Sequence, residues 1–238
     1  VQTCALPIST GGAVAAYPNV QVDVIELSPS MVTGATYFAD HNFHVTERPN
    51  VHIKLDDGLN HLLVTPKKYD VATADIIQPD HVGAGNLYSK EYFTLLRKGL
   101  APGGIVAQWA ERGKPKLYPY IVRTFLDAFP HVSFWCSGRI MLGTNEPLDL
   151  NRERLARNLA DPTVAKLFAD LGILSVDDLL AHYTGDDSVF RQSLGASPVV
   201  SDDRPVTEYF RVLPDGDEPG LAKLPPDGKS CPLLARAG

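Results

Sequence analysis

The sequence predicts an α/β fold, built on a doubly wound, mostly parallel β-sheet with a terminal antiparallel hairpin and a small helical appendage. Three observations carry this prediction. Short apolar runs bounded by acids alternate with amphipathic helical stretches between residues 22 and 129. Two strand-like runs then flank Ser137-Gly138, which is the spacing of a hairpin with one antiparallel edge strand. From Asp149 onward, helical stretches follow one another without strands.

The composition limits the class of protein. With 238 residues, of which 44% are hydrophobic, the chain can bury the core of one large domain and an appendage. The net charge is -6 and the basic residues are scattered, which argues against a nucleic-acid surface. No apolar run reaches the roughly 18 residues of a membrane span, and the first residues lack the pattern of a signal peptide. Three scattered cysteines are too few for a disulfide framework or a zinc site, so we expect a cytoplasmic location.

The first eight residues are expected to lie outside the natural protein. Residues 1–8 (VQTCALPI) have no convincing strand or helix pattern and are similar to the translation of a common sequencing-adapter oligonucleotide. We interpret them as a cloning or assembly scar, with the natural sequence starting near Ser9 after a lost N-terminus. The alternative is that they form a poor first strand.

The predicted sheet begins with strand and helix units. Gly11 and Gly12, followed by small apolar residues up to Tyr17, suit a glycine turn that runs into a helix. The next units are a strand at 22–27 (VDVIEL), a helix at 29–39 with proline in its first turn, a strand at 51–55 (VHIKL) and a short helix at 59–63.

A central strand leads into the loop that is expected to carry chemistry. The stretch 71–74 (VATA) is a small apolar run between acids, typical of a strand buried on both faces. Asp75 ends it, and residues 76–86 hold two glycines and a proline, so they form a loop before a helix that begins at Ser89. Open parallel sheets bind ligands at this edge. The simpler reading is that Asp75 only caps a turn.

The remaining elements complete the sheet and the appendage. We expect a helix at 89–100 that stops before Pro102-Gly103-Gly104, a strand at 105–110, a helix at 116–129 and hairpin strands at 131–135 and 139–144. Appendage helices are expected at 151–159, 162–171, 175–182 and 188–194, then a turn and short strand at 201–212, and a disordered tail beyond 214. The resulting divisions are residues 1–8, a main domain at 9–146, the appendage at 147–213 and the tail at 214–238.

Three acids follow three successive strands. Glu26, Asp57 and Asp75 stand at carboxyl ends that converge on one crevice in a doubly wound sheet. A carboxylate after the second strand can accept hydrogen bonds from both ribose hydroxyls of a nucleoside, and one after the third can accept from an adenine amino group. Each acid alone is a weak signal, because Asp and Glu commonly end strands. Together with the loop after Asp75 they indicate a nucleoside-binding site.

A resemblance to a known family rests on four motifs: VDVIELSP, IKLDDG, YDVATADIIQP followed by GNLYSKEYF, and LAPGGIVAQW. In this order and spacing they resemble the core of the spermidine synthase (polyamine aminopropyltransferase) family. The resemblance implies a Rossmann-like fold of the S-adenosylmethionine-dependent methyltransferase type. It implies aminopropyl transfer from decarboxylated S-adenosylmethionine to a putrescine-like amine, without a metal. By position, Glu26 is the ribose-binding glutamate, Asp57 with Gly58 the adenine-binding element and Asp75 the catalytic aspartate.

Two features depart from the family's pattern. The second aspartate of the usual Asp-Ser-Ser/Thr-Asp-Pro loop, which helps to hold the diamine, is Gln78 here. An amide cannot neutralise an ammonium as a carboxylate does, so the acceptor amine is left open. The family's glycine-rich first motif and small N-terminal β domain are also absent, so we expect a truncated piece whose own activity is open. Tyr88, just beyond the loop, either lines the substrate pocket or packs in the core.

The appendage and the motif SDDRPVTEYF at 201–210 resemble a bacterial branch in which this domain follows a multi-spanning membrane region. On that resemblance the full-length parent is membrane-anchored. We expect a small-molecule amine substrate and no nucleic acid, and a homodimer is left open. Two rival functions share the fold, because fold does not fix function. One is methyl or other alkyl transfer from S-adenosylmethionine, and the other is a non-catalytic domain that binds a nucleoside or only folds beside a membrane region.

Two further groups of residues invite a functional reading that their spacing does not support. The histidines at 41, 44, 52 and 61 lack cysteine or carboxylate partners at metal-ligand spacing, so we expect them at the surface. Asp202 and Asp203, before Arg204-Pro205, are expected to form a turn with a local ion pair, and a functional role is the less favoured alternative.

Overall fold

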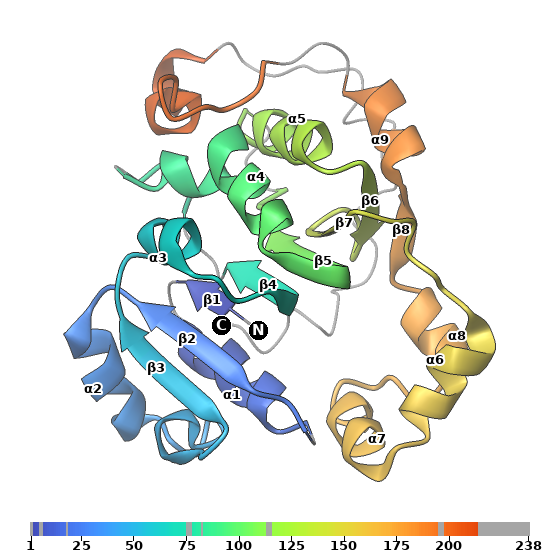
Figure 1. Cartoon of the computed structure of the whole chain (residues 1–238). Helices are drawn as coiled ribbons and strands as arrows, with labels where there is room; N and C mark the ends of the chain where they lie inside the picture. Colours follow the sequence, from blue (N-terminus) through green and yellow to red (C-terminus); the bar gives the residue numbers. More distant parts are fainter. Residues whose placement is uncertain are drawn as a thin grey trace.

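One eight-stranded sheet runs through the computed structural model, with the strand order β3-β2-β1-β4-β5-β7-β6-β8 (Figure 1). The structure describes residues 2–4, 7–17, 19–74, 78–81, 83–112, 116–194 and 198–213. Its strands are β1 (Gln2–Cys4), β2 (Val22–Glu26), β3 (Val51–Leu55), β4 (Tyr69–Ala74), β5 (Leu100–Trp109), β6 (His131–Trp135), β7 (Ile140–Thr144) and β8 (Tyr183–Asp186). The first five are parallel, and β7 is antiparallel to both of its neighbours. The predicted α/β sheet, with Val71–Ala74 in its interior, is therefore confirmed.

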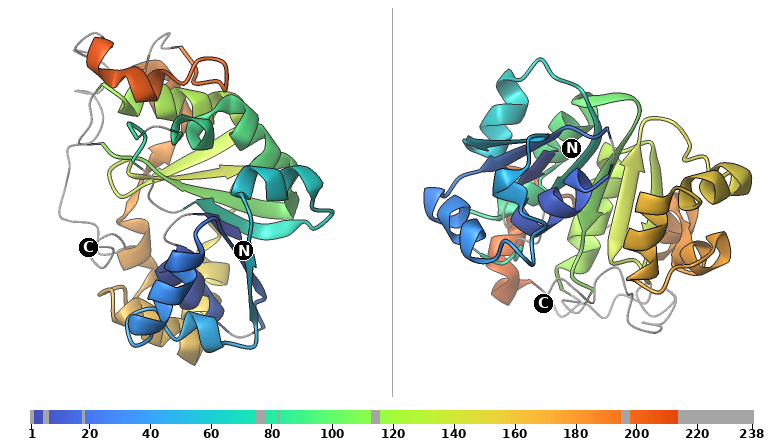
Figure 2. Two further views of the ribbon diagram at one scale, coloured as in Figure 1. Left: turned by 90° about the vertical axis from the view of Figure 1, so that its left-hand side faces the viewer. Right: turned by 90° about the horizontal axis from the view of Figure 1, so that it is seen from below.

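Helices cover both faces of this sheet (Figures 1 and 2). They are α1 (Pro7–Ala15), α2 (Pro29–Tyr37), α3 (Gly58–Val64), α4 (Lys90–Lys98), α5 (Tyr118–Ala128), α6 (Arg152–Leu159), α7 (Pro162–Ala169), α8 (Val176–Leu180) and α9 (Asp187–Ser193), with short 3-10 helices η1 (Val45–Glu47), η2 (Gly85–Tyr88) and η3 (Val206–Val212). An apolar cluster with residues of α1, β2 and β3 lies on one face. The larger cluster, with residues of α3, α4, α5 and α9, lies on the other. This arrangement is the doubly wound architecture.

The slot between β2 and β4 is occupied by β1, a strand of three residues. It pairs with β2 from Gln2↔Asp23 to Cys4↔Ile25 but shares only the pair Gln2↔Ala72 with β4. Residues 2–4 therefore form a poor first strand. This outcome was the alternative to interpreting residues 1–8 as a scar outside the fold.

The glycine turn predicted at Gly11-Gly12 is wrong, because both glycines lie inside α1. A Cβ on Gly12 would lie 1.9 Å from the backbone oxygen of Asn42, and one on Gly11 would lie 3.0 Å from Val24 Cγ2. The glycines thus allow α1 to approach β2 and the chain around Asn42 closely. Sequence periodicity cannot separate this use of glycine from a turn.

The helix α4 shows how local signals set the bounds of an element. Ser89 accepts a hydrogen bond from the backbone N–H of Tyr92 at 3.1 Å, which caps the helix as the sequence predicts. Tyr92, Phe93 and Leu96 are buried against the sheet, and each such side chain contributes roughly 1.5 to 3 kcal/mol when it leaves water. The helix ends at Lys98, before Gly99, and β5 begins at once at Leu100. The predicted stop at Pro102 was therefore too late.

The hairpin of β6 and β7 is confirmed, with β7 antiparallel to its neighbours as expected, but the antiparallel strand at the sheet edge is one that was not predicted. β7 inserts between β5 and β6, and the missed strand β8 covers the outer side of β6. The ring of Phe190, in the helix after β8, stacks on Phe134 with centroids 3.4 Å apart. The sequence YTGD of β8 is short and polar, so it gives no strand signal. Cys136, in the hairpin turn, is disulfide-bonded, although the cysteine count predicts no disulfide framework.

The appendage contains the four predicted helices, α6 to α9, within a few residues of their expected bounds. The short strand expected at 201–212 is wrong, because a turn at Ser201 to Arg204 leads into the 3-10 helix η3. The ion pair expected between Asp202 or Asp203 and Arg204 is not among the ion pairs of the described residues. The predicted tail at 214–238 lies outside the described residues. Among the helices that the structure describes, none has the length and apolar character needed to cross a membrane.

Candidate functional site

The carboxyl ends of the central strands form one edge of the sheet, and three of the predicted site residues lie along it. β2 and β3 pair in register up to Glu26↔Leu55, so Asp57 follows just beyond the level of Glu26. Gly58 begins α3 directly after it. β4 ends at Ala74, level with Gln108 near the end of β5. The parallel register therefore brings these positions to a common edge.

Glu26 has a buried carboxylate, and only one of its two oxygens has a hydrogen-bond partner in the described chain. Its side chain belongs to a residue that is only 4% exposed. Oε1 accepts a hydrogen bond from the backbone N–H of Ser28 at 2.8 Å. Oε2 is buried and has no hydrogen-bond partner in the described part of the chain. Because an unpaired buried acceptor is costly, such an oxygen is typical of a site where a ligand supplies the donor. This arrangement fits the predicted recognition of ribose hydroxyls.

Asp57 has a structural use that the sequence prediction did not include. Its Oδ1 accepts the backbone N–H of Asn60 at 3.0 Å and so caps the N-terminus of α3. The residue is exposed, and Gly58 beside it is buried. One oxygen thus fixes the start of α3, and the other remains available at the edge for a ligand. The adenine-binding role stays a prediction.

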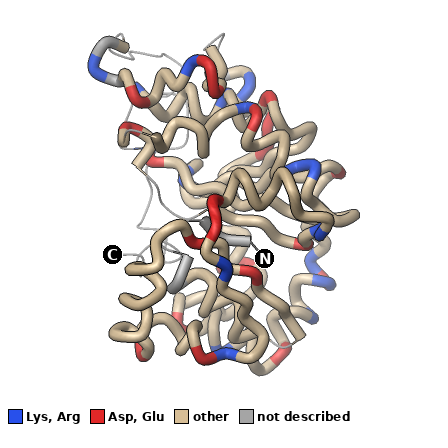
Figure 3. Tube along the Cα trace, turned by 60° about the vertical axis from the view of Figure 1, so that its left-hand side comes forward, with Lys and Arg blue, Asp and Glu red and all other residues tan. Residues whose placement is uncertain are grey.

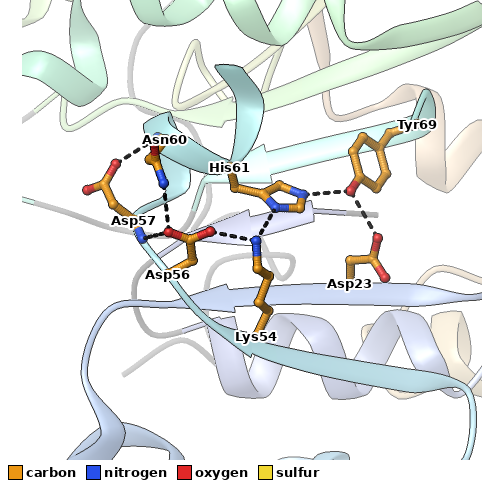
Figure 4. Close-up of polar contacts among 7 residues, drawn as sticks. All are labelled: Asp23, Lys54, Asp56, Asp57, Asn60, His61 and Tyr69. Atoms are coloured by element: carbon orange, nitrogen blue, oxygen red, sulfur yellow. Dashed lines mark hydrogen bonds and ion pairs between the residues drawn. The ribbon is translucent and has the colours of Figure 1, made fainter. Parts of the chain in front are cut away.

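A polar network runs behind these acids, from the carboxyl edge toward the start of β4 (Figure 4). Lys54 Nζ lies 2.6 Å from Asp56 Oδ2 and 3.5 Å from His61 Nδ1. His61 Nε2 is 3.0 Å from the hydroxyl of Tyr69, which donates to Asp23 Oδ2 at 2.9 Å. A continuous series of contacts therefore links Asp56, next to the candidate site, to Asp23 at the start of β2.

The charge states in this network follow from pairing and burial. The hydrogen bond from Lys54 holds the pKa of Asp56 at about 2, with help from Asn60. Burial lowers the pKa of His61, and the neighbouring Lys54 lowers it further, so its ring is neutral at pH 7. Burial opposes ionisation of Asp23, but hydrogen bonds from Lys67 and Tyr69 lower its pKa on balance.

The histidine prediction is right at three positions and wrong at the fourth. His41, His44 and His52 are exposed, whereas His61 is buried in the network. Within the described residues, no three His, Cys, Asp or Glu side chains gather in a way that could hold a metal ion.

A cavity of about 710 Å³ lies at the opposite edge of the sheet from Glu26 and Asp57. Residues at the starts of β2 and β4 line it, with Val14 of α1 and Val164 of α7. Asp23 and Tyr69, in its wall, already bond to each other. Because parallel sheets bind ligands at the carboxyl ends of their strands, this cavity is not the expected nucleoside site.

The loop after β4 is described only in part. Asp75, the predicted catalytic residue, lies outside the described residues together with residues 76 and 77. Gln78 is half-buried, and its backbone carbonyl accepts the N–H of His81 at 3.0 Å. Tyr88 ends the loop in η2 and is 1% exposed within the main apolar cluster. Burial raises the pKa of its phenol, and Asp80 and Glu111 add to this. Tyr88 is thus packed in the core.

Gln108 is a site candidate that the sequence prediction missed. It is 2% exposed and lies level with Ala74, the last residue of β4. Its Nε2 donates to the backbone oxygen of Trp109 at 3.0 Å, while its Oε1 is buried without a partner in the described chain. The signal in the sequence is a lone amide in the otherwise apolar strand IVAQW. Periodicity alone does not distinguish this amide from an ordinary strand residue.

Basic and acidic residues are interspersed along the described chain (Figure 3). Neither sign forms a continuous stripe along the trace of a described element.

Comparisons with known proteins agree on one family. Residues 13–141 match the family model described as spermine/spermidine synthase domain. A polyamine aminopropyltransferase of Mycobacterium tuberculosis is 33% identical over 103 residues, which is 42% of this chain and 19% of that protein. One from Oceanobacillus iheyensis is 31% identical over 142 residues, which is 57% of this chain and 23% of that protein. The chain therefore spans about a fifth of the length of the curated relatives it matches.

Solved structures show the same fold. A probable spermidine synthase from Corynebacterium glutamicum gives a TM-score of 0.58 at 19% identity, over 84% of this chain and 71% of that one. A spermidine synthase in complex with the transition state analogue AdoDATO gives a TM-score of 0.52 at 11% identity, over 93% of this chain and 68% of that one. Human methyltransferase-like protein 13 in complex with SAH gives a TM-score of 0.50 at 16% identity, over 76% of this chain and 79% of that one. The Rossmann-like methyltransferase fold predicted from the sequence is thus confirmed.

Proposed function

Because the chain belongs to the spermine/spermidine synthase family, we propose that it transfers the aminopropyl group of decarboxylated S-adenosylmethionine to a primary amine and releases methylthioadenosine. The matched region of residues 13–141 holds every residue to which we assign a direct role. The observation that carries the proposal is the buried Glu26, whose Oε2 has no partner among the described residues at the ligand-binding edge of the sheet.

The nucleoside is assigned to the ends of β2 and β3. Glu26 Oε2 accepts from a ribose hydroxyl, and this new hydrogen bond offsets the cost of burying the oxygen unpaired. Asp57 keeps one oxygen on Asn60 and offers the other to an adenine amino group. The two side chains thus bind the parts of the nucleoside that do not react.

The reaction requires a neutral amine. A primary amine like that of lysine has a pKa near 10.4, so its deprotonation at pH 7 costs roughly 4 to 5 kcal/mol. We assign Asp75, the residue directly after β4, to orient the ammonium and to accept its proton as the nitrogen attacks. The new bond joins the amine nitrogen to the propyl carbon beside the sulfonium. The bond from that carbon to sulfur breaks, and its electron pair leaves with the neutral thioether.

The acceptor amine is assigned to neutral groups near the end of β4. Gln78, in the loop, stands where the family usually has a carboxylate, and Gln108 keeps an unpaired amide oxygen beside Ala74. Amide oxygens accept hydrogen bonds from an ammonium but do not neutralise it. The subsite therefore favours an acceptor whose second positive charge is weaker or more remote than that of a short diamine.

Binding and turnover measurements test the proposal. Isothermal calorimetry with decarboxylated and intact S-adenosylmethionine should show tighter binding of the decarboxylated form, and mass spectrometry should detect methylthioadenosine once an amine is added. Preference for the intact form would instead support methyl transfer. The absence of binding by either form would support a non-catalytic domain.

A further inference from the structure

The carboxylate of Glu208 holds the loop that follows β4 from a position far along the chain. Glu208 Oε1 lies 3.0 Å from the backbone nitrogen of Gly83 and 3.0 Å from that of Gly85, and it accepts both N–H groups. These contacts span 125 and 123 residues of sequence. Two hydrogen bonds to the same oxygen fix the backbone between the two glycines.

Both glycines suit this close approach. Gly83 has a φ of +83°, in the left-handed region that glycine adopts without strain. A Cβ on Gly85 would lie 2.8 Å from Glu208 Oε1 and 2.8 Å from Pro205 Cβ. The loop backbone is therefore packed directly against the segment that carries Glu208, with no room for a side chain at position 85.

That segment is itself anchored to the helices beside the loop. The backbone oxygen of Val200 accepts from Lys90 N at 2.9 Å, and Val200 N donates to Thr124 Oγ1 at 2.8 Å. The backbone N–H of Asp202 donates to Glu91 Oε2 at 3.1 Å. In Figures 1 and 2, η3 lies over α4 and α5, on the side of the sheet away from α1 and α2. The segment that carries Glu208 is therefore held in place by hydrogen bonds to α4 and α5.

We propose that Glu208 is a positioning residue for acceptor-amine binding, because it fixes the second half of the loop that carries Gln78 and ends at Tyr88. The inference rests on the proposed aminopropyl transfer. Glu208 does so through the backbone of Gly83 and Gly85 and contacts no substrate. Glu26 and Asp57, to which the nucleoside is assigned, bond to Ser28 and Asn60 and share no hydrogen bond with residues 83–88 in the described chain, so we expect nucleoside binding to be independent of Glu208.

Three variants separate the hydrogen-bonding role from charge and from general damage. Glu208→Ala removes both acceptor contacts, whereas Glu208→Gln keeps an amide oxygen that can accept from the same two N–H groups. Asp203→Ala is the matched control, since it removes an exposed carboxylate from the same segment. Hydrogen exchange of the 83–88 peptide, followed by mass spectrometry, should be about tenfold to a hundredfold faster in Glu208→Ala. Exchange should stay near the wild-type rate in the other two.

Steady-state kinetics with an acceptor amine supply the second measurement. Glu208→Ala should raise the KM for the amine and lower kcat, each by about three- to thirtyfold, because the acceptor subsite is less well ordered. The dissociation constant of methylthioadenosine should stay within about twofold of wild type. Glu208→Gln should restore most of kcat and KM.

Each alternative outcome contradicts a defined part of the inference. Unchanged exchange at 83–88 in Glu208→Ala overturns it, as does faster exchange with unchanged amine kinetics. If Glu208→Gln and Glu208→Ala lowered kcat and raised KM equally, the charge of Glu208, and not its pair of hydrogen bonds, would position the loop. If Glu208→Ala fails to fold, Gly85→Ala disturbs the same contact from the loop side and should give the same faster exchange. If the wild-type protein transfers no aminopropyl group, the proposed function fails, while the exchange data still decide whether Glu208 holds the loop.

Discussion

The amino edge and the carboxyl edge of the sheet both bury polar side chains, but the partners of these side chains differ. At the amino edge, Asp23 accepts hydrogen bonds from Lys67 and Tyr69, and the hydroxyl of Tyr69 also contacts His61. At the carboxyl edge, Glu26 and Gln108 each keep one buried oxygen without a partner in the described chain. The amino edge nevertheless has the cavity of about 710 Å³.

The unpaired oxygens of Glu26 and Gln108 point to a ligand, whereas Asp23 and Tyr69 in the wall of the cavity are already bonded to each other. A buried polar group that is fully paired recovers the cost of leaving water and contributes to stability. One left unpaired costs about 1 to 3 kcal/mol, which a protein tolerates where a ligand later supplies the partner. We therefore expect substitutions at the amino edge to change stability, and those at the carboxyl edge to change binding and turnover.

Among these substitutions, we expect Asp75→Asn to change turnover the most. Asp75→Asn should lower kcat by about 10²- to 10⁴-fold, the range for a positioned acid or base group. Methylthioadenosine should still bind, because the nucleoside is assigned to Glu26 and Asp57, and calorimetry beside the kinetics checks both. Full turnover by Asp75→Asn with any amine would place the chemistry elsewhere and remove the main functional contrast between the two edges.

The next largest effect is on nucleoside affinity. Glu26→Gln should weaken methylthioadenosine binding by about 1 to 3 kcal/mol, because one carboxylate acceptor is lost. The free energy of unfolding should not fall, since no protein group depends on Oε2 in the described chain. Calorimetry and urea unfolding measure these quantities, with the exposed Glu153→Gln as control. Unchanged affinity in both Glu26→Gln and Asp57→Asn would mean that the nucleoside binds at another place.

At the amino edge the expected effect is on stability. Tyr69→Phe removes the hydroxyl between His61 and Asp23, and it should lower the free energy of unfolding by about 1 to 2 kcal/mol. Urea unfolding measures this, and Tyr37→Phe, at a residue that is 81% exposed, is the control. Methylthioadenosine affinity should be unchanged. A fall in affinity without a fall in stability would reverse the roles assigned to the two edges.

A gain is expected at the acceptor subsite. Gln78→Asp restores a carboxylate near the ammonium, so kcat/KM for a short diamine such as putrescine should rise by about tenfold. Competition between amine substrates measures the change in preference. If Gln78→Asp leaves the preference unaltered, the acceptor is selected by other residues, with Gln108 the next to test.

The smallest effect is a pH dependence of stability from the amino-edge network. The pKa of His61 is lowered from 6.5 by burial and by Lys54, with Lys67 acting in the same direction and Asp23 and Asp56 opposing it. The unfolded chain therefore binds the proton more tightly, so the His61 contribution is present above pH 6.5 and is lost as the pH falls through the folded-state value. Urea midpoints between pH 7 and pH 5 should fall less steeply in His61→Gln than in wild type, with His41→Gln as control. Equal slopes would show that His61 does not titrate differently on folding.

Much of the fold could be predicted, because the signals for it are local. The apolar runs at Val22–Glu26, Val51–Leu55 and Tyr69–Ala74 become β2, β3 and β4, and Ser89 caps α4 as expected. The edge strand β8 could not be predicted, since its sequence YTGD is typical of a turn. It forms a strand because it pairs with the outer side of β6. The glycines in α1 were assigned to a turn for a similar reason. Their role depends on Asn42, which lies thirty residues further along the chain.

The α/β class, the family and the place of Glu26 at a strand end could be predicted from the sequence alone, because periodicity, capping and motif spacing lie within a few residues of each element. The pairing of polar groups depends instead on the tertiary fold. It placed Asp23 with Tyr69 and Glu208 with Gly83 and Gly85, and it left oxygens of Glu26 and Gln108 without partners in the described chain. Those contacts join residues up to 125 positions apart. Local pattern carries no information about them, because the distance between such residues is set by the packing of the whole sheet and its helices.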